Sequence, residues 1–215
     1  MNRRALGCLF ELVETLLLAL VVFVVVQLFV AQPYQVQQES MENTLMPSQY
    51  ILVDKLTPKF DDYHRGDIVV FNPPTNSKWT ADPTGTPYVK RIIGIAGDTI
   101  DIHDGGVYVN GSRLSESYLY LGQPTVPESW KLPLTLTADQ YFVMGDHRQA
   151  SQDSRAFGPI TKESIIGRAW LRYWPMDEFG VLPRTEPADL SSPQPGASPV
   201  ASGAPKSAAP SASGR

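Results

Sequence analysis

Three short stretches of this sequence carry side chains that could perform chemistry. The first is Glu39-Ser40-Met41, which begins a few residues after a long apolar run. A serine between polar neighbours is usually an ordinary loop residue, and Ser40 alone would be interpreted in that way. Its position is more informative, because a nucleophile tethered so closely to an apolar segment would act at a membrane surface.

The second stretch is Tyr88–Asp98, where Lys90 and Arg91 interrupt an otherwise apolar strand. Side chains alternate along a strand, so one of these two is expected to face inward. One interpretation is an edge strand whose charges prevent aggregation. The other is a lysine shielded from water. An ordinary lysine is neutral at pH 7 in only about one copy in 2,500. Burial can lower its pKa by several units, and a neutral amine can take the proton of a serine hydroxyl.

The third stretch runs from Gly145 to Gly158 and is densely polar, with a glycine at each end. It could be a solvated loop, or it could orient a catalytic side chain from behind. The residues that offer charges and hydroxyl groups are Asp146, Arg148, Ser151, Asp153, Ser154 and Arg155.

Other kinds of site have weaker support. The three histidines, His64, His103 and His147, are scattered, and His147 and its neighbour Asp146 would point in opposite directions in a strand. A Ser–His enzyme is therefore possible but weakly supported. Metal-ligand spacings and phosphate-binding or dinucleotide-binding fingerprints are absent from the sequence, so neither a metal nor a cofactor is expected.

Charge and cysteine content narrow the function classes further. The 215 residues include 18 basic and 22 acidic side chains, a net charge of −4, which argues against a generally basic nucleic-acid-binding protein. The single cysteine, Cys8, excludes a disulfide framework within one chain.

The N-terminal segment is expected to be a membrane anchor over residues 1–31. No charged residue occurs from Thr15 through Gln38, and the apolar stretch, extended back to Ala5, gives a helix of about 27 residues, long enough to span a bilayer. A cleaved secretory signal is the alternative. It would have a shorter apolar core, and cleavage after Ala31 would place the large side chain of Phe29 at the −3 position.

Two basic residues fix the expected orientation. Arg3 and Arg4 precede the apolar stretch, and positively charged flanks stay on the cytoplasmic side. We therefore expect a single-pass protein of the cell membrane with a cytoplasmic N-terminus and an extracytoplasmic domain.

Residues 32–184 are expected to form a mostly antiparallel β domain. Short runs rich in β-branched and aromatic residues are separated by turn clusters, and no long helical pattern follows the anchor. Asn110-Gly111 predicts a tight hairpin turn with two positive φ angles. The expected strand regions are residues 50–56, 68–71, 88–95, 106–114, 141–144 and 165–173.

Three segments are expected to lie outside the core. Residues 72–87 and 118–133 are rich in proline and are interpreted as surface loops. In the last 30 residues, 186–215, Ala, Ser, Pro and Gly account for 23 positions. Such a composition cannot bury enough apolar area to fold, so residues 185–215 are expected to be a disordered tail.

Together these stretches resemble bacterial type I signal peptidase, a membrane-anchored Ser/Lys endopeptidase. The resemblance covers the anchor and most of residues 32–174, in the same order. It rests on Ser40-Met41 after the anchor, on Lys-Arg-x-x-Gly-x-x-Gly-Asp at 90–98, and on Gly-Asp-x-Arg-x-x-Ser-x-Asp-Ser-Arg at 145–155. It implies a mainly β fold: an SH3-like barrel-type catalytic core, a smaller β subdomain and an apolar face near the lipid.

The resemblance also implies roles for individual residues. Ser40 matches the nucleophile and Lys90 the general base, while Ser151 matches the hydroxyl that holds the lysine amine. Asp153 and Arg155 match a supporting ion pair. The residues that match the oxyanion hole or the substrate groove are Gln38, Met41, Tyr88 and Val89.

This chain departs from the family pattern at several positions. Asn43 and Ala96 stand where prolines are usual, and Asn43 is expected to leave the turn after the nucleophile less rigid. His147 and Gln149 replace Asn and Asp, and Gln38 replaces a small residue or serine that assists the oxyanion hole.

The implied activity is removal of signal peptides from exported preproteins, after small residues at −1 and −3, at the lipid bilayer. Neither nucleic acid nor metal is an expected partner. Two other functions remain open. One is a Ser/Lys peptidase with a dedicated substrate, and the other is a catalytically silent, membrane-tethered domain that binds peptides.

Overall fold

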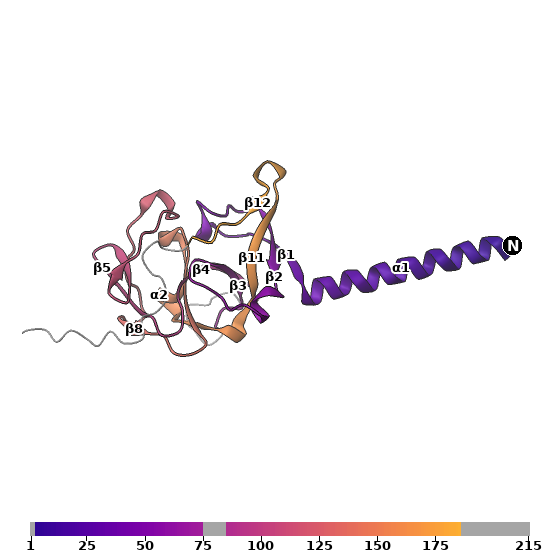
Figure 1. Ribbon diagram of the computed structural model, residues 1–215. Helices are drawn as coiled ribbons and strands as arrows, with labels where there is room; N and C mark the ends of the chain where they lie inside the picture. The colour runs from indigo at the N-terminus through magenta and orange to yellow at the C-terminus, as the bar shows by residue number, and fades with distance from the viewer. Residues whose placement is uncertain (1–2, 75–84, 186–215) are drawn as a thin grey trace, which may run out of the picture.

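The computed structural model describes residues 3–74 and 85–185 (Figure 1). The expected tail and most of the 72–87 loop lie outside these ranges. The described part is mostly β, as predicted, with a long helix α1 (Arg3–Phe29) and a short helix α2 (Ser154–Phe157). The strands are β1 (Ala31–Gln35), β2 (Tyr50–Asp54), β3 (Ile68–Phe71), β4 (Tyr88–Gly94), β5 (Thr99–His103), β6 (Gly106–Val109), β7 (Ser112–Arg113), β8 (Leu134–Thr135), β9 (Gln140–Met144), β10 (Ile160–Thr161), β11 (Ile165–Trp174) and β12 (Gly180–Val181).

Helix α1 extends away from the β domain (Figure 1). The 20 residues Phe10–Phe29 are long enough and apolar enough to cross a bilayer, and none of this stretch is buried inside the protein. Leucine, valine and phenylalanine side chains in such numbers are unfavourable in water. The helix is therefore suited to a lipid environment, which agrees with a membrane-anchored protein.

The anchor continues almost directly into the sheet. The helix ends at Phe29, and Ala31, which the sequence placed in the anchor, already pairs with Asp54 of β2. The backbone N–H of Lys55 also donates to the carbonyl of Val30, at 2.9 Å. These backbone bonds end the helix earlier than expected, and they make the connection to the domain a strand rather than a loose tether.

The larger sheet has eight strands and carries the residues of interest. Its order is β1-β2-β11-β3-β4-β9-β10, with β12 paired to β11. The antiparallel pairs β11–β2, β11–β3 and β4–β9 contain register shifts, which increase strand bending and twist. Strand β4 lies between β3 and β9, so the edge-strand interpretation of its charged residues is wrong.

A second sheet, ordered β7-β6-β5-β8, lies on the far side of the domain from α1 (Figure 1). The predicted turn between β6 and β7 is confirmed, with φ of 54° at Asn110 and 80° at Gly111. Apolar side chains of β5 and β6 pack against those of β4 and β9, so the second sheet covers part of the first. The buried residues at this junction are Ile93, Ile100, Ile102, Val107, Val109, Phe142 and Met144.

The segment 118–133 is only in part a surface loop. Leu121 and Val126 are exposed, as expected, but Tyr118 and Thr125 are buried. Tyr118 belongs to the core cluster under the second sheet. Apart from the 3₁₀ turn at Tyr120–Gly122 this segment is irregular, and irregular chain can be buried where its polar groups find partners.

Candidate active site

Ser40 and Lys90 are in direct contact. The Nζ atom of Lys90 lies 2.7 Å from the Oγ atom of Ser40 and 3.1 Å from the carbonyl oxygen of Val89. Only 1% of Lys90 and 4% of Ser40 are exposed. The serine stands in the 3₁₀ turn η1 (Glu39–Met41), and the lysine stands in the middle of β4. A serine hydroxyl and a lysine amine at this distance can exchange a proton.

Burial prepares this lysine for deprotonation. Removal from water lowers the pKa of Lys90 to about 8 from its ordinary value of 10.5. The carboxylates of Asp153 and Asp146 act in the opposite direction, and the positive charge of Arg155 adds to the lowering. An amine with a pKa of about 8 is neutral at pH 7 in about one copy in ten.

Strand alternation predicted that either Lys90 or Arg91 would be buried, but both are. Arg91 is 0% exposed, and its Nε and Nη2 atoms donate to the two carboxylate oxygens of Asp146 at 2.9 and 2.6 Å. Its Nη1 atom donates to the carbonyl of Gly66 at 3.0 Å. The alternation itself holds, but β4 is an inner strand covered on both faces.

The Arg91–Asp146 pair also holds the segment that follows the serine. Thr44 donates from Oγ1 to Oδ2 of Asp146 at 2.5 Å and accepts from Nη2 of Arg91 at 3.1 Å. The backbone N–H of Thr44 in turn donates to the carbonyl of Met41, at 3.0 Å. The sequence did not predict this ion pair, because the two residues are 55 positions apart and no local pattern links them.

The turn after Ser40 is held differently from the family pattern. Asn43 has a φ of 84°, which proline cannot adopt, since its ring fixes φ near −65°. The Nδ2 atom of Asn43 donates to the carbonyl of Tyr118 at 3.0 Å. This side-chain hydrogen bond ties the turn to the 118–133 segment, and the expectation of a less rigid turn stays a prediction.

Three polar residues of the 145–158 stretch form a buried group beside this site. Ser151 donates from Oγ to Oδ2 of Asp153 at 2.7 Å, and Arg155 donates from Nε to Oδ1 of Asp153 at 2.9 Å. Burial alone would raise the pKa of Asp153, but hydrogen bonds from Arg155 and Ser151 outweigh it and lower this pKa. In this arrangement the single Ser151 hydroxyl hydrogen points to Asp153. A direct bond between Ser151 and the lysine amine stays a prediction.

Gly145 allows this group to approach the nucleophile turn. A Cβ atom at position 145 would overlap the carbonyl oxygen of Ser40 and would lie 2.5 Å from the Cβ atom of Ser151. Ser40 and Ser151 therefore both approach the place that a side chain at position 145 would occupy. Any larger residue would force them apart.

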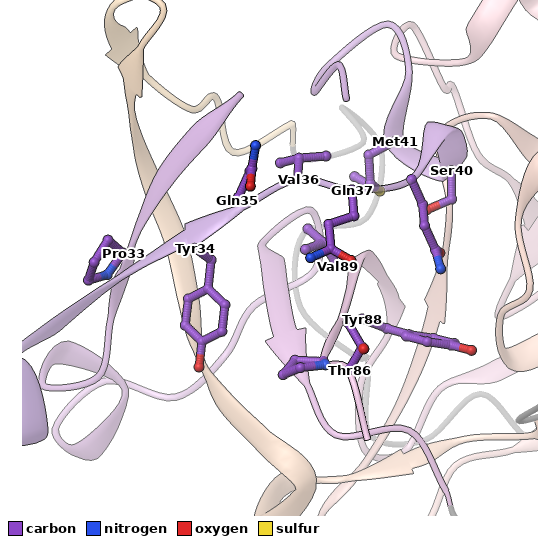
Figure 2. A pocket seen from close by; sticks show the side chains of 12 residues that line it. Pro33, Tyr34, Gln35, Val36, Gln37, Ser40, Met41, Thr86, Tyr88 and Val89 are labelled. Carbon is purple, nitrogen blue, oxygen red and sulfur yellow. The ribbon is translucent and has the colours of Figure 1, made fainter. Parts of the chain in front are cut away.

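A cavity of about 210 Å³ opens at Ser40 (Figure 2). It runs between residues 33–38 and residues 86–89, with Ser40 at one end and Pro33 at the other. All four residues expected to bind substrate contribute to its walls, namely Gln38, Met41, Tyr88 and Val89. Other lining residues, among them Tyr34 and Val36, were not predicted, because their segment does not have the pattern of a regular strand.

The histidines form no Ser–His arrangement with Ser40. The Nδ1 atom of His147 lies 3.0 Å from Oε2 of Glu42, whereas its neighbour Asp146 binds Arg91. His103 lies beside Asp104, and His64 lies near Asp61 and Asp67. Over residues 3–74 and 85–185, no three His, Cys, Asp or Glu side chains are grouped in a way that could hold a metal ion.

Comparison with known proteins identifies the family. Residues 9–174 match the family model described as signal peptidase, peptidase S26. The chain is 36% identical over 173 residues to the probable signal peptidase I-2 of Synechocystis sp., with 80% of this chain and 76% of that protein covered. It is 37% identical over 185 residues to signal peptidase I P of Bacillus subtilis subsp. natto, with 83% and 96% covered.

A solved structure is also similar. The crystal structure of a signal peptidase I from Enterococcus faecalis V583 shares 31% identity, with a TM-score of 0.39, over 50% of this chain and 97% of that one. The family match spans most of this chain, and the relatives align over most of their own lengths. This chain therefore belongs to the signal peptidase family of serine endopeptidases, peptidase S26.

Proposed function

We propose that this protein cleaves signal peptides from exported preproteins, with Ser40 as the nucleophile and Lys90 as the general base. The observation that carries the proposal is the 2.7 Å contact between the serine hydroxyl and a buried amine, at one end of a cavity. Similarity to signal peptidases supports the reaction class. The geometry supports the assignment of the two residues.

The shape of the cavity supports an extended peptide as substrate. Its walls are two lengths of extended or irregular chain, residues 33–38 and 86–89, which could bind a peptide backbone between them. In an extended peptide, alternate side chains point the same way, so the −1 and −3 side chains would enter the cavity together. A volume of about 210 Å³ leaves ample room for two small side chains such as those of alanine.

The chemistry follows from the two groups in contact. Neutral Lys90 takes the proton of Ser40 as Oγ attacks the carbonyl carbon of the −1 residue. The protonated amine then gives that proton to the leaving nitrogen, and the peptide bond breaks to leave an acyl-enzyme. Lys90, neutral again, takes a proton from water as the water attacks the ester, and returning this proton to Ser40 restores the enzyme.

The negative charge on the carbonyl oxygen needs hydrogen-bond donors. The backbone N–H of Ser40 and the side-chain amide of Gln38 are the candidates, and both residues line the cavity. In this proposal Ser151, Asp153 and Arg155 are positioning residues behind the lysine. Their buried bonds fix the local backbone, and the Asp153 carboxylate partly compensates a transient ammonium at Lys90.

The placement of the substrate follows from the anchor. We propose that Arg3 and Arg4 stay in the cytoplasm and that the β domain lies outside the membrane. The cavity would then meet the part of a preprotein that has just left the bilayer, while its signal helix remains in the lipid.

Alanine substitutions in the full-length protein in detergent test the proposal. Ser40→Ala and Lys90→Ala should each abolish processing of a preprotein. Ser112→Ala and Lys131→Ala, which change an exposed serine and an exposed lysine, should leave processing unchanged. Turnover retained by either of the first two variants would overturn the assignment. A protein that binds a signal peptide without cleaving it would be a peptide-binding domain instead.

A further inference from the structure

A contact outside the Ser–Lys pair connects the nucleophile turn to the polar loop after β9. The Nδ1 atom of His147 lies 3.0 Å from Oε2 of Glu42, and the side chains are only 14% and 15% exposed. Glu42 directly follows Ser40 and Met41, and its backbone N–H closes the turn on the carbonyl of Glu39 at 3.0 Å. The histidine therefore binds the residue at which the nucleophile turn ends.

A backbone bond joins the same two segments on the other side of the serine. The N–H of His147 donates to the carbonyl oxygen of Ser40 at 3.1 Å. This same oxygen lies where a Cβ atom at position 145 would be, so the close approach of loop and turn requires Gly145. His147 thus contacts the turn twice, once through its backbone and once through its ring.

Neighbouring groups keep the imidazole directed at Glu42. The ring of Tyr120 packs against it, with ring centroids 4.2 Å apart. The adjacent charges are already paired, because Asp146 binds Arg91 and Arg148 binds Glu116. Among the described contacts of the imidazole, Glu42 is the one charged group that faces it, and Tyr120 is the one other titratable group.

We propose that His147 and Glu42 are positioning residues for peptide-bond cleavage, which fix the orientation of Ser40 toward Lys90. The proposal rests on the function proposed above. An N–H on Nδ1, present in the neutral Nδ1 tautomer and in the cation, donates to the Glu42 carboxylate. Loss of this bond would leave Glu42 held through its backbone, with the next side-chain bonds at Asn43 and Thr44. Misplacement of a nucleophile by about 1 Å can lower a rate about 100-fold.

The test compares four variants of the full-length protein in detergent. His147→Ala and Glu42→Ala should each lower kcat about 10-fold to 100-fold, with KM changed less than about threefold. The double variant should be no slower than the slower single variant, because both remove the same bond. His147→Asn should retain kcat within about threefold of wild type, since the asparagine amide nitrogen is as many bonds from the backbone as Nδ1.

The chain offers a matched control. The Nδ1 atom of His103 also lies 3.0 Å from a carboxylate, that of Asp104, and its ring stacks on Tyr108. This pair is exposed; His103 ends β5 of the second sheet, and Asp104 lies in the turn that follows. His103→Ala should therefore leave kcat unchanged. An acylating penem probe counts the serines that react, and dividing the measured rate by this number gives kcat per active site. A variant that is partly unfolded is then not mistaken for one with a lower kcat.

Three results would overturn the inference: wild-type kcat per active site in His147→Ala, losses that multiply in the double variant, or His147→Asn as slow as His147→Ala. These results differ from a failure of the proposed function. If Ser40→Ala retained turnover, the proposed function would fall. If Ser40 were required and His147 were not, only the positioning role would be wrong.

Discussion

The Nζ atom of Lys90 lies 2.7 Å from Oγ of Ser40, although 50 residues separate them in the chain. The lysine reaches this position from the middle of an inner strand, and the serine reaches it from a turn that backbone hydrogen bonds close. Both atoms are shielded from water. A lysine on the surface could make the same contact, but it would remain an ammonium at neutral pH and could not accept a proton.

The first prediction concerns pH. Only the neutral amine of Lys90 can accept the serine proton, and burial lowers its pKa to about 8. The value of kcat/KM for preprotein cleavage should therefore rise about tenfold per pH unit below that value and level off above it. Steady-state assays from pH 6 to 10.5 would measure the midpoint. A midpoint near the ordinary lysine value of 10.5 would contradict the role of Lys90 as a shielded base.

The second prediction concerns stability. Below pH 8 Lys90 is protonated in both folded and unfolded chains, so the folded state bears the penalty of a buried ammonium. Between about pH 8 and pH 10.5 the lysine is neutral in the folded chain and still protonated in the unfolded chain. Wild-type stability should therefore rise as pH increases through this window. Lys90→Met removes the penalty and should be more stable at pH 7, by up to about 3 kcal/mol.

Denaturant unfolding of both proteins at several pH values measures this difference. Other titrating groups are common to the two proteins, so the difference between their curves isolates Lys90. If Lys90→Met were no more stable than wild type at pH 7, or followed the same pH dependence, the lysine would not be desolvated in the folded protein.

The third prediction concerns the ion pair on the other face of β4. Asp146→Asn removes the charge that neutralises the buried guanidinium of Arg91, and loss of one partner of a buried pair is destabilising by about 3–5 kcal/mol. Asp104→Asn, at an exposed site, should change the free energy of unfolding by less than about 0.5 kcal/mol. Urea unfolding compares the two. If both substitutions changed the free energy of unfolding by the same small amount, another group would neutralise the charge of Arg91, and Asp146 would not be its essential partner.

The fourth prediction concerns Asn43. Replacement by proline, the usual family residue, should be destabilising by about 2 kcal/mol or more and should lower kcat, because φ at this position is 84°. Asn43→Gly should be much better tolerated, since glycine adopts this φ and only the bond to Tyr118 is lost. Thermal unfolding and preprotein cleavage rank the two variants. A proline variant as active and stable as wild type would show that the turn can adopt the family conformation.

Local signals in the sequence were sufficient for much of the fold. Asn110-Gly111 predicted its hairpin because the turn chemistry is contained in two residues. The strand at 68–71 has the predicted bounds, since β-branched and aromatic residues favour strands and turn residues mark both ends of this run. The five strands β1, β5, β8, β10 and β12 were not predicted. Strands β8, β10 and β12 have two residues each, and β1 contains Pro33, so pairing with a neighbour defines these four rather than their own composition. Strand β5, Thr99–His103, alternates polar and apolar residues as a strand does, and it was overlooked.

The candidate site was predictable only in part, and the reason is distance along the chain. Alternation indicated that Lys90 and Arg91 face opposite ways, but not that both faces of β4 are covered. Resemblance to a family supplied Ser40 as the partner of Lys90, which spacing alone could not have done. The contact of His147 with Glu42 depends on how the polar loop packs against the nucleophile turn, and no local sequence pattern predicts that packing.

The junction between anchor and domain has a mechanical consequence. Since Ala31 pairs with Asp54 and Val30 accepts a bond from Lys55, the sheet itself sets the distance between the end of α1 and Ser40. One residue inserted within 31–35 would not simply lengthen that connection. It would turn the remainder of the strand over, and Tyr34 would leave the cavity it lines.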